Sequence, residues 1–436
     1  VATFYVAFAA VSLAAYWLVA HDATRRALSA GRVYLVLALL GEALLLVGLL
    51  LSAQAAGGLE VAAVAAALAE APFALTCLVL GFGLKAGMLP LHMWLPLAHA
   101  AAPTPASATL SGAIVKAGII GLVRFLPDDQ ALWSGALIWL GLLGAYFGVL
   151  VGLTQRNAKT VLAYSTISQM GLVIAALGAG LRAEAVLYAA HHGLAKGALF
   201  LGVGVLAATG RRHLPWVGAL AALAALSLAG APLSGGALAK AAIKPGFVDW
   251  QKGAVALSAA GTAVLLGRAL WLSARGHAAA DDARSHTLLL LPWLGLTLAA
   301  LLLPWVLIEQ FSALSAGYAL RATALWDGAW PLLFGAGLAG AALVYCANDD
   351  GIGRNRADRG EGRCHALASG LFRSAVICSM TQSMLMACPV VVRAQTVSPA
   401  KSLSTFSPLA ASLSASRANT RRSSADSSNS GSTSTT

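Results

Sequence analysis

The sequence predicts an all-α, polytopic membrane protein with about eleven transmembrane helices, and its composition and patterning support this fold class. Of the 436 residues, 58% are hydrophobic and 11% are charged, and the mean hydropathy is +0.77. Apolar runs of roughly 20 residues, enough for a helix to cross a bilayer, recur along the chain. These runs lack the alternation of apolar and polar residues that is typical of transmembrane β-barrels.

Hydropathy places the expected spans along the chain, with basic and acidic residues in alternate loops. By the positive-inside rule, the basic loops lie in the cytoplasm and the first residue lies outside. These loops and the segment beyond residue 350 account for the net charge of +12, so nucleic-acid binding is disfavoured. The expected spans are residues 2–20, 33–53, 72–90, 106–125, 132–152, 160–180, 184–208, 214–248 (interrupted), 253–273, 287–307 and 329–347.

The five cysteines do not form a recognisable binding pattern. None of them has C-x-x-C spacing, which argues against an iron–sulfur site and against a disulfide framework. No nucleotide-binding or cytochrome motif accompanies them. We therefore expect no cofactor and no metal site, and no redox chemistry by this chain alone.

The segment 84–125 contains the most informative residues of the chain. Lys85 lies in an apolar run that Pro90 and Pro96 interrupt, and Lys116 lies in the next apolar run. Proline lacks the backbone N–H and forces a helix to kink or stop. Irregular backbone at membrane depth survives only where protein or a water-filled cavity surrounds it, and a lysine there costs about 2.5–3.5 kcal/mol on insertion scales. The segment therefore predicts that both lysines face the bundle interior, on an ion path.

Four other residues near this segment carry expectations. Glu42 lies midway along the second span, where it is either the acidic partner of Lys85 or a neutral carboxylic acid bonded to a neighbouring helix. His92 lies within the break and His99 just beyond it, and a hydrogen bond to loop backbone is favoured over proton transfer for both. Trp94 is expected to be an interfacial anchor.

The seventh span carries two adjacent histidines and a lysine. His192 and Lys196 are spaced i,i+4 and share one face of a helix, and histidine titrates near neutral pH. His191 is a secondary candidate. The alternatives are a purely structural pair, or haem ligation by the adjacent histidines, although haem ligands usually come from facing helices.

The eighth span is interrupted at residues 230–236 by the sequence GAPLSGG. Lys240 follows the interruption and Lys244 lies one turn further, beside Pro245. Lys240 is the favoured candidate, because Lys244 can extend to the membrane surface from the helix end. Two broken spans at matching positions are what an inverted repeat produces, and they indicate the transport site.

Long motifs at these positions resemble those of the antiporter-like membrane subunits of respiratory complex I, membrane-bound hydrogenases and multisubunit sodium/proton antiporters. The first is K-x-G-x-x-P-L-H-x-W-L-P-x-A-H-x-x-A-P-x-P-x-S-A from Lys85, followed by S-G-x-x-V-K-x-G. The second is K-x-x-L-A-Y-S-T-I-S-Q-x-G from Lys159, whose hydroxyls and Gln169 are expected to bridge helices or hold water. The others are H-x-x-x-K-x-x-L-F-L from His192 and a P-x-S-G segment in which Lys240 comes one residue later than in the family.

The resemblance implies a proton path through buried side chains and water. Its expected members are Glu42, Lys85, Lys116, His192, Lys196 and Lys240, with His92, His191, Lys159 and Lys244 as secondary candidates; Lys159 is alternatively an anchor at the cytoplasmic surface. The first span aligns with the family's fifth helix and has Ala9 where the family has a glutamate. By this comparison the antiporter-like domain, 1–347, lacks the family's first four helices.

Residues 348–436 differ in composition from the rest of the chain. They are polar and end in a region rich in serine, threonine, alanine and arginine, which predicts either a disordered basic tail or a non-native, frameshifted one.

The expected function is that of a proton-conducting subunit driven by partner membrane subunits, in a complex I-like, hydrogenase-like or Mrp-like assembly. Alternatives are transport of sodium or inorganic carbon, and a non-conducting structural subunit. The finer motifs are closest to the antiporter D-type and hydrogenase-type branch. The expected location is the inner (plasma) membrane of a prokaryote.

Overall fold

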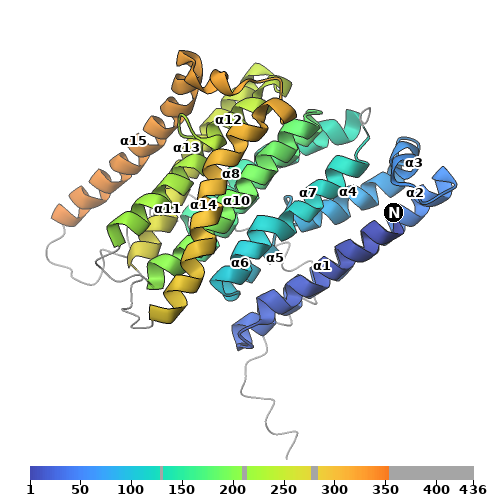
Figure 1. The fold of residues 1–436 in the computed structure, drawn as a ribbon, viewed down its shortest axis with the longest axis horizontal. Helices are drawn as coiled ribbons and strands as arrows, with labels where there is room; N and C mark the ends of the chain where they lie inside the picture. The colour runs from blue at the N-terminus through green and yellow to red at the C-terminus, as the bar shows by residue number, and fades with distance from the viewer. Residues whose placement is uncertain (128–130, 209–213, 276–282, 353–436) are drawn as a thin grey trace, which may run out of the picture. The chain divides into compact units, whose positions relative to one another are not determined.

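The computed structural model describes residues 1–127, 131–208, 214–275 and 283–352, and these residues form helices joined by short connections, with no strand among them (Figure 1). The all-α fold class is therefore confirmed. The polar tail predicted for 348–436 lies outside the described residues from 353 onward, and α15 continues past the expected end of the last span at 347.

The first half of the chain contains seven α-helices and one π-helical turn. In order they are α1 (Ala2–Ala20), α2 (Arg25–Ala56), α3 (Val61–Ala67), α4 (Pro72–Ala86), α5 (Trp94–Ala101), α6 (Thr104–Thr109), the π-helical turn η1 (Leu110–Ile114) and α7 (Val115–Phe125).

The second half contains the remaining helices of the described residues. In order they are α8 (Ala131–Leu153), α9 (Ala158–Gly178), α10 (Arg182–Ala208), α11 (Leu214–Ala229), α12 (Gly235–Ile243), the 3-10 turn η2 (Lys244–Gly246), α13 (Asp249–Arg275), α14 (Ala283–Phe311), the 3-10 turn η3 (Ala316–Leu320) and α15 (Ala322–Ile352).

Eight helices in the described part of the chain are long and apolar enough to cross a membrane. The number becomes nine if α3 and α4, bent by 116° at their junction, count as one span. The predicted total of about eleven is not confirmed by this count. Part of the difference comes from the broken spans, because interruption leaves α4, α5, α11 and α12 short.

Both predicted interruptions are present. After α4 the chain turns at Gly87, whose φ of 72° lies in the left-handed region that favours glycine, and helix resumes at Trp94. After α11 it turns at Gly230, with φ of 94°, and Ser234 caps the new helix by accepting a hydrogen bond from the Ala237 N–H. An inverted repeat relating the two halves stays a prediction.

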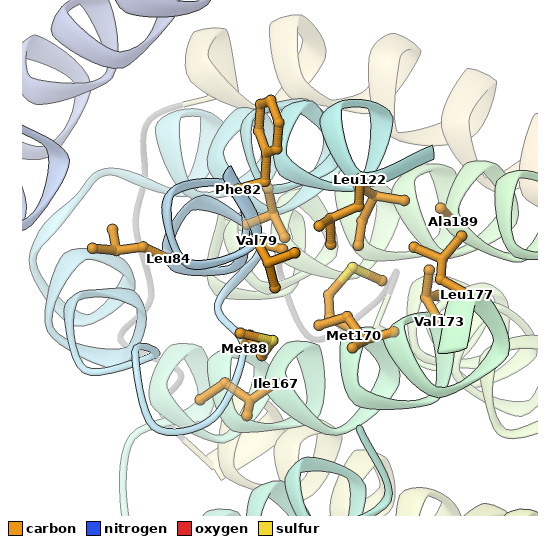
Figure 2. Close-up of a cluster of buried hydrophobic side chains, with 14 of the residues drawn as sticks. Val79, Phe82, Leu84, Met88, Leu122, Ile167, Met170, Val173, Leu177 and Ala189 are labelled. Atoms are coloured by element: carbon orange, nitrogen blue, oxygen red, sulfur yellow. The ribbon is translucent and has the colours of Figure 1, made fainter. Parts of the chain in front are cut away.

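Burial is concentrated on α9. In an 18-residue apolar stretch of α9, 94% of the residues are buried, whereas the corresponding stretches of α1 and α14 have 22% and 28% of their residues buried. Figure 2 shows Val79 of α4 and Leu122 of α7 on the side of Met170 of α9. The interior around α9 is therefore shielded on all sides, while α1 and α14 leave apolar side chains exposed, as expected for surfaces that contact lipid.

Candidate functional site

The six primary candidates for the path are all buried. Relative exposure lies between 0% and 8% for the six primary candidates, which are Glu42, Lys85, Lys116, His192, Lys196 and Lys240. A charged group in such surroundings is stable only with hydrogen-bonding partners. The structure brings these residues together in three groups, each centred on one or more lysines.

The first group joins α1, α2 and α4. The Lys85 amine donates to the Ser12 hydroxyl at 2.5 Å and to the Tyr34 hydroxyl at 3.1 Å. The Ser12 hydroxyl also forms a hydrogen bond with Glu42 Oε1, and Tyr34 donates to the Ser12 carbonyl at 2.9 Å. Among the described residues the Lys85 amine and the Glu42 carboxylate have no direct ion pair, because Ser12 lies between them.

This arrangement bears on Ala9, the residue at the position of the family glutamate. Ser12 lies three residues after Ala9, on the same face of α1, so the carboxylate of Glu42 reaches the region from α2 instead. Glu42 Oε2 has no hydrogen-bond partner among the described protein atoms, so only one oxygen of this buried carboxyl group is bound by the protein.

The second group lies at the centre, between α7, η1, α9 and α10. The Lys116 amine contacts His192 Nδ1 at 2.7 Å and donates to the Ser111 carbonyl in the π-helical turn. Such turns occur often at functional sites because they distort the backbone hydrogen-bond ladder locally. Lys196 instead points to α9, where it donates to the Leu162 carbonyl at 2.8 Å and to the Ser165 hydroxyl.

His191 leads from this centre toward the second break. Its Nε2 lies 3.1 Å from the Ser227 hydroxyl on α11, while His192 faces Lys116. The two adjacent histidines therefore contact different residues on different helices. Sequence reasoning ranked His191 as secondary, but the structure places it between the central group and the third group.

The third group is Lys240 with the break that precedes it. The Lys240 amine donates at 2.6 Å to the carbonyl of Ala229, the last residue of α11. Close packing at Gly236 sets this geometry, because a Cβ there would lie 1.7 Å from the Ser227 carbonyl oxygen and 2.9 Å from the His191 ring. The absence of a side chain at Gly236 therefore allows α12 to lie directly against α10 and α11.

The two histidines near the first break are buried among aromatic rings. His92 packs edge-on against Phe147 with ring centroids 4.8 Å apart, and His99 stacks on Phe200 at 4.4 Å. Neither ring nitrogen of His99 has a hydrogen-bond partner among the described residues, so the expected bond from its ring to loop backbone is wrong. The aromatic contacts replace that bond.

The expectation for Trp94 is also wrong. Its side chain is 1% exposed, and its indole N–H donates to the Leu84 carbonyl at 2.9 Å. This carbonyl belongs to the last turn of α4, where backbone acceptors lack intrahelical partners. Trp94 therefore holds the two halves of the first broken helix together instead of anchoring the chain at an interface.

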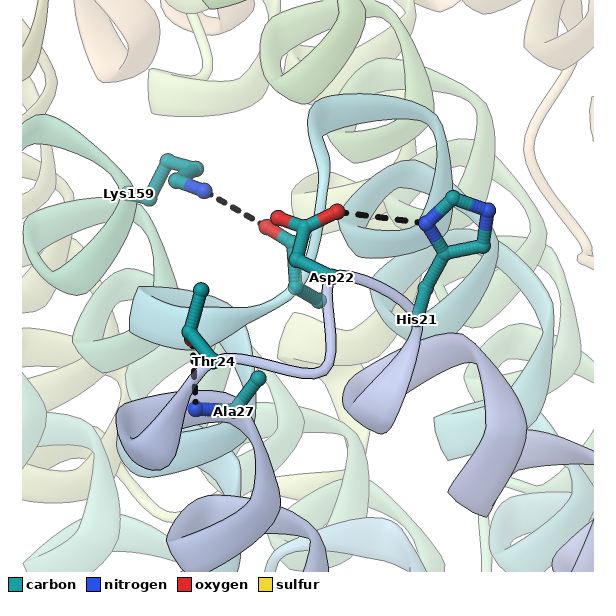
Figure 3. Close-up of polar contacts among 6 residues, drawn as sticks. His21, Asp22, Thr24, Ala27 and Lys159 are labelled. Carbon is teal, nitrogen blue, oxygen red and sulfur yellow. Dashed lines mark hydrogen bonds and ion pairs between the residues drawn. The ribbon is translucent and has the colours of Figure 1, made fainter.

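Lys159 and Lys244 lie nearer the ends of the bundle. Lys159 donates to the Ala102 carbonyl at 2.6 Å and interacts electrostatically with the Asp22 carboxylate on the loop after α1; Figure 3 draws both side chains. Lys244 forms an ion pair with Asp327 of α15 at 2.7 Å. Each of these two lysines therefore has a polar partner on a different segment of the chain.

Sequence reasoning missed several functional partners. Besides Ser12 and Tyr34, it missed the two partners of Gln169: Tyr188 donates to Gln169 at 2.6 Å, and Gln169 donates to Thr262 at 2.8 Å. Tyr188 precedes His192 by four residues and so shares its helix face, a signal that the sequence contained. Gln169 bridges three helices, as predicted for this motif.

Comparison with known proteins identifies the family. The model of the NADH:quinone oxidoreductase/Mrp antiporter transmembrane family matches residues 1–266. The chain belongs to this family. The predicted resemblance is therefore confirmed, and the protein is a multi-pass membrane protein.

The relatives are named as components or subunits of several different enzymes and of an antiporter. Hydrogenase-4 component B of Escherichia coli is 35% identical over 265 residues, which cover 52% of this chain and 39% of the relative. NADH-quinone oxidoreductase subunit M of Pseudomonas aeruginosa is 36% identical over 132 residues, which cover 29% of this chain and 26% of the relative. The chain thus spans about two fifths or less of the length of these relatives.

A solved structure has the same fold. A chain of the membrane-bound sulfane sulfur reductase, an archaeal respiratory membrane complex, superposes with a TM-score of 0.59 at 24% identity. The match covers 76% of this chain and 72% of that chain. This likeness extends the fold assignment beyond residue 266.

Proposed function

We propose that this protein is a proton-conducting membrane subunit of a multisubunit ion-translocating complex. The observation that carries the proposal is the set of four lysine amines, Lys85, Lys116, Lys196 and Lys240, that are at most 8% exposed and are bound by hydroxyls, carbonyls or an imidazole. In membrane spans such interior ionisable groups usually mark ion or proton pathways.

Proton movement in this proposal depends on the neighbours of each amine. A carboxylate that approaches or leaves a buried lysine changes how tightly the lysine holds its proton. At Lys85 that carboxylate is Glu42, and the Ser12 hydroxyl between them both accepts and donates. At Lys116 the neighbour is His192, whose ring nitrogen Nδ1 can donate or accept a hydrogen bond, depending on the tautomer.

The relatives support an inference about partners and location. Relatives named as hydrogenase, formate hydrogenlyase and NADH-quinone oxidoreductase subunits belong to multisubunit membrane complexes. We infer that this chain also works beside other membrane subunits, which supply the driving force, and that it resides in a prokaryotic plasma membrane. The chain alone is not expected to be an enzyme.

Proton flux in membrane vesicles that contain the full assembly tests this proposal. Lys116→Met should abolish proton uptake, because it removes the amine that contacts His192. Lys252→Met is the matched control, since Lys252 is exposed and pairs only with Asp249, three residues earlier. Undiminished flux in Lys116→Met would show a non-conducting, structural subunit. Flux that follows sodium or bicarbonate at fixed pH would show transport of those ions.

A further inference from the structure

The outer end of α12 contains a polar cluster that the proposed path does not use. Lys244 lies one helical turn after Lys240, so the two side chains share a face. Lys244 forms its 2.7 Å ion pair with Asp327, whose side chain is 45% exposed, against 22% for Lys244. The pair therefore connects the buried end of the path with the surface.

A small cavity joins these groups. Its volume is about 40 Å³, and its polar lining consists of Lys240, Lys244, Tyr318 and Asp327. Since one water needs roughly 10–15 Å³ of such volume and two to four polar partners, the cavity is large and polar enough for about three waters. Lys240 and Asp327 thus face one space of a size suited to proton transfer through water.

The approach of α15 creates this cavity. A Cβ at Gly328 would lie 3.1 Å from the Gly230 carbonyl oxygen and 3.2 Å from Pro232 N, so α15 packs closely against the second break. The adjacent Asp327 is thereby brought to Lys244. Asp327 and Tyr318 both lie beyond residues 1–266, the part of the chain that matches the family.

The charges around the cavity suit a proton acceptor at its mouth. Two lysines one turn apart repel when both are charged, and Asp327 offsets the charge of Lys244. Burial and the Asp327 carboxylate raise the pKa of the Tyr318 phenol, while Arg321, which lies over the Tyr318 ring, opposes this shift. Tyr318 therefore stays a neutral hydroxyl at neutral pH and leaves Asp327 as the acceptor.

We propose that the Asp327 carboxylate forms the outer port of the path, where a proton passes between Lys240 and the external water. In the outward direction the Lys240 ammonium releases a proton to cavity water, which transfers a proton to the Asp327 carboxylate. The resulting carboxylic acid then loses that proton to bulk solvent, which restores the carboxylate. This inference rests on the proposed function and adds a site contributed by α15.

Proton flux in vesicles with the full assembly separates a port from a mere anchor for α15. Asp327→Asn removes the carboxylate and the ion pair, and should lower flux at neutral pH about tenfold. Lys244→Gln breaks the same ion pair but keeps the carboxylate, and should retain flux within about twofold. Asp327→Glu should recover most of the flux. The control is Asp249→Asn, the same substitution at a fully exposed position on the neighbouring α13.

The outcomes are distinct. Equal loss in Asp327→Asn and Lys244→Gln would overturn the port, because it would show that only the ion pair matters. Unchanged flux in Asp327→Asn would overturn it as well. Assembly levels of each variant, measured on native gels, show whether α15 is still in place. Absence of flux in the wild type, or normal flux in Lys116→Met, would instead refute the proposed function itself.

Discussion

The two broken helices present a lysine to the interior in different electrostatic surroundings. Lys85 lies near a buried carboxyl group, Glu42, and the Ser12 hydroxyl connects the two. Lys240 has a backbone carbonyl as its hydrogen-bond partner, and the nearest carboxylate in its cavity, Asp327, already pairs with Lys244. The positive charge of Lys85 is therefore offset by a carboxyl group inside the protein, whereas the carboxylate nearest to Lys240 lies near the surface.

This difference indicates how similar helix breaks can serve different steps. A lysine with a buried acidic partner can alternate between charge-balanced states without solvent. A lysine whose nearest carboxylate is exposed can exchange protons with water. On the proposed path, the buried position of Glu42 suits transfer within the membrane in the first half, and the exposed position of Asp327 suits exchange with solvent in the second.

The largest expected effect is on folding, and it differs between the breaks. In Gly236→Ala the new Cβ would overlap the Ser227 carbonyl at 1.7 Å, and backbone cannot easily move. We expect the free energy of unfolding to fall by more than about 4 kcal/mol and the variant to fail to assemble. In Gly87→Ala the left-handed φ of 72° costs about 1–2 kcal/mol and the Leu95 side chain must shift. Thermal unfolding and native gels measure both; equal stability would contradict this ranking.

The next largest effect is expected when each lysine of the two broken helices is replaced. The loss of stability should differ between Lys85 and Lys240. Lys85→Met leaves the buried Glu42 without its cationic neighbour, so we expect the free energy of unfolding to fall by about 3–5 kcal/mol. Lys240→Met leaves only the Ala229 carbonyl without its donor and should cost about 1–3 kcal/mol. Adding Glu42→Gln to Lys85→Met should restore stability, as measured by thermal unfolding. A double variant no more stable than Lys85→Met would show that Glu42 is already uncharged.

A relocated carboxylate tests whether Glu42 substitutes for the family glutamate. Glu42→Ala should lower proton flux about tenfold, equivalent to about 1.4 kcal/mol in barrier height. Adding Ala9→Glu places a carboxylate one turn from Ser12 on the same face and should recover most of that loss. Ala10→Glu, at an exposed position of α1, is the control and should recover nothing. Equal recovery from both positions would contradict a specific role for the carboxylate.

Much of this arrangement could be predicted from local sequence. Lysines inside apolar runs must face the interior, and proline or glycine-rich segments must interrupt helices, so Lys85, Lys116 and Lys240 were identifiable without a structure. The pairing of the two histidines was not. Successive residues on a helix point about 100° apart, and only helix packing decides that His192, not His191, faces Lys116.

Residues that act through distant contacts also escaped prediction. Ser12 is an ordinary small residue in an apolar helix, and its role depends on neighbours 30 and 73 positions away. Asp327 is exposed and 83 residues from Lys244, so no motif links them. Trp94 was misassigned because tryptophan is usually interfacial, whereas here the broken helix turns it into the core.

The smallest effect is expected at the opposite end of the bundle from Asp327. Asp22 is also a surface carboxylate near a lysine, Lys159, but its side chain is 48% exposed and it contacts His21 at 3.2 Å. Lys159 keeps its 2.6 Å bond to the Ala102 carbonyl without Asp22. Asp22→Asn should therefore change stability by less than about 1 kcal/mol and flux by less than twofold. A tenfold loss of flux would instead mean that both ends of the path depend on an exposed carboxylate, and the contrast between the halves would then lie only in Glu42.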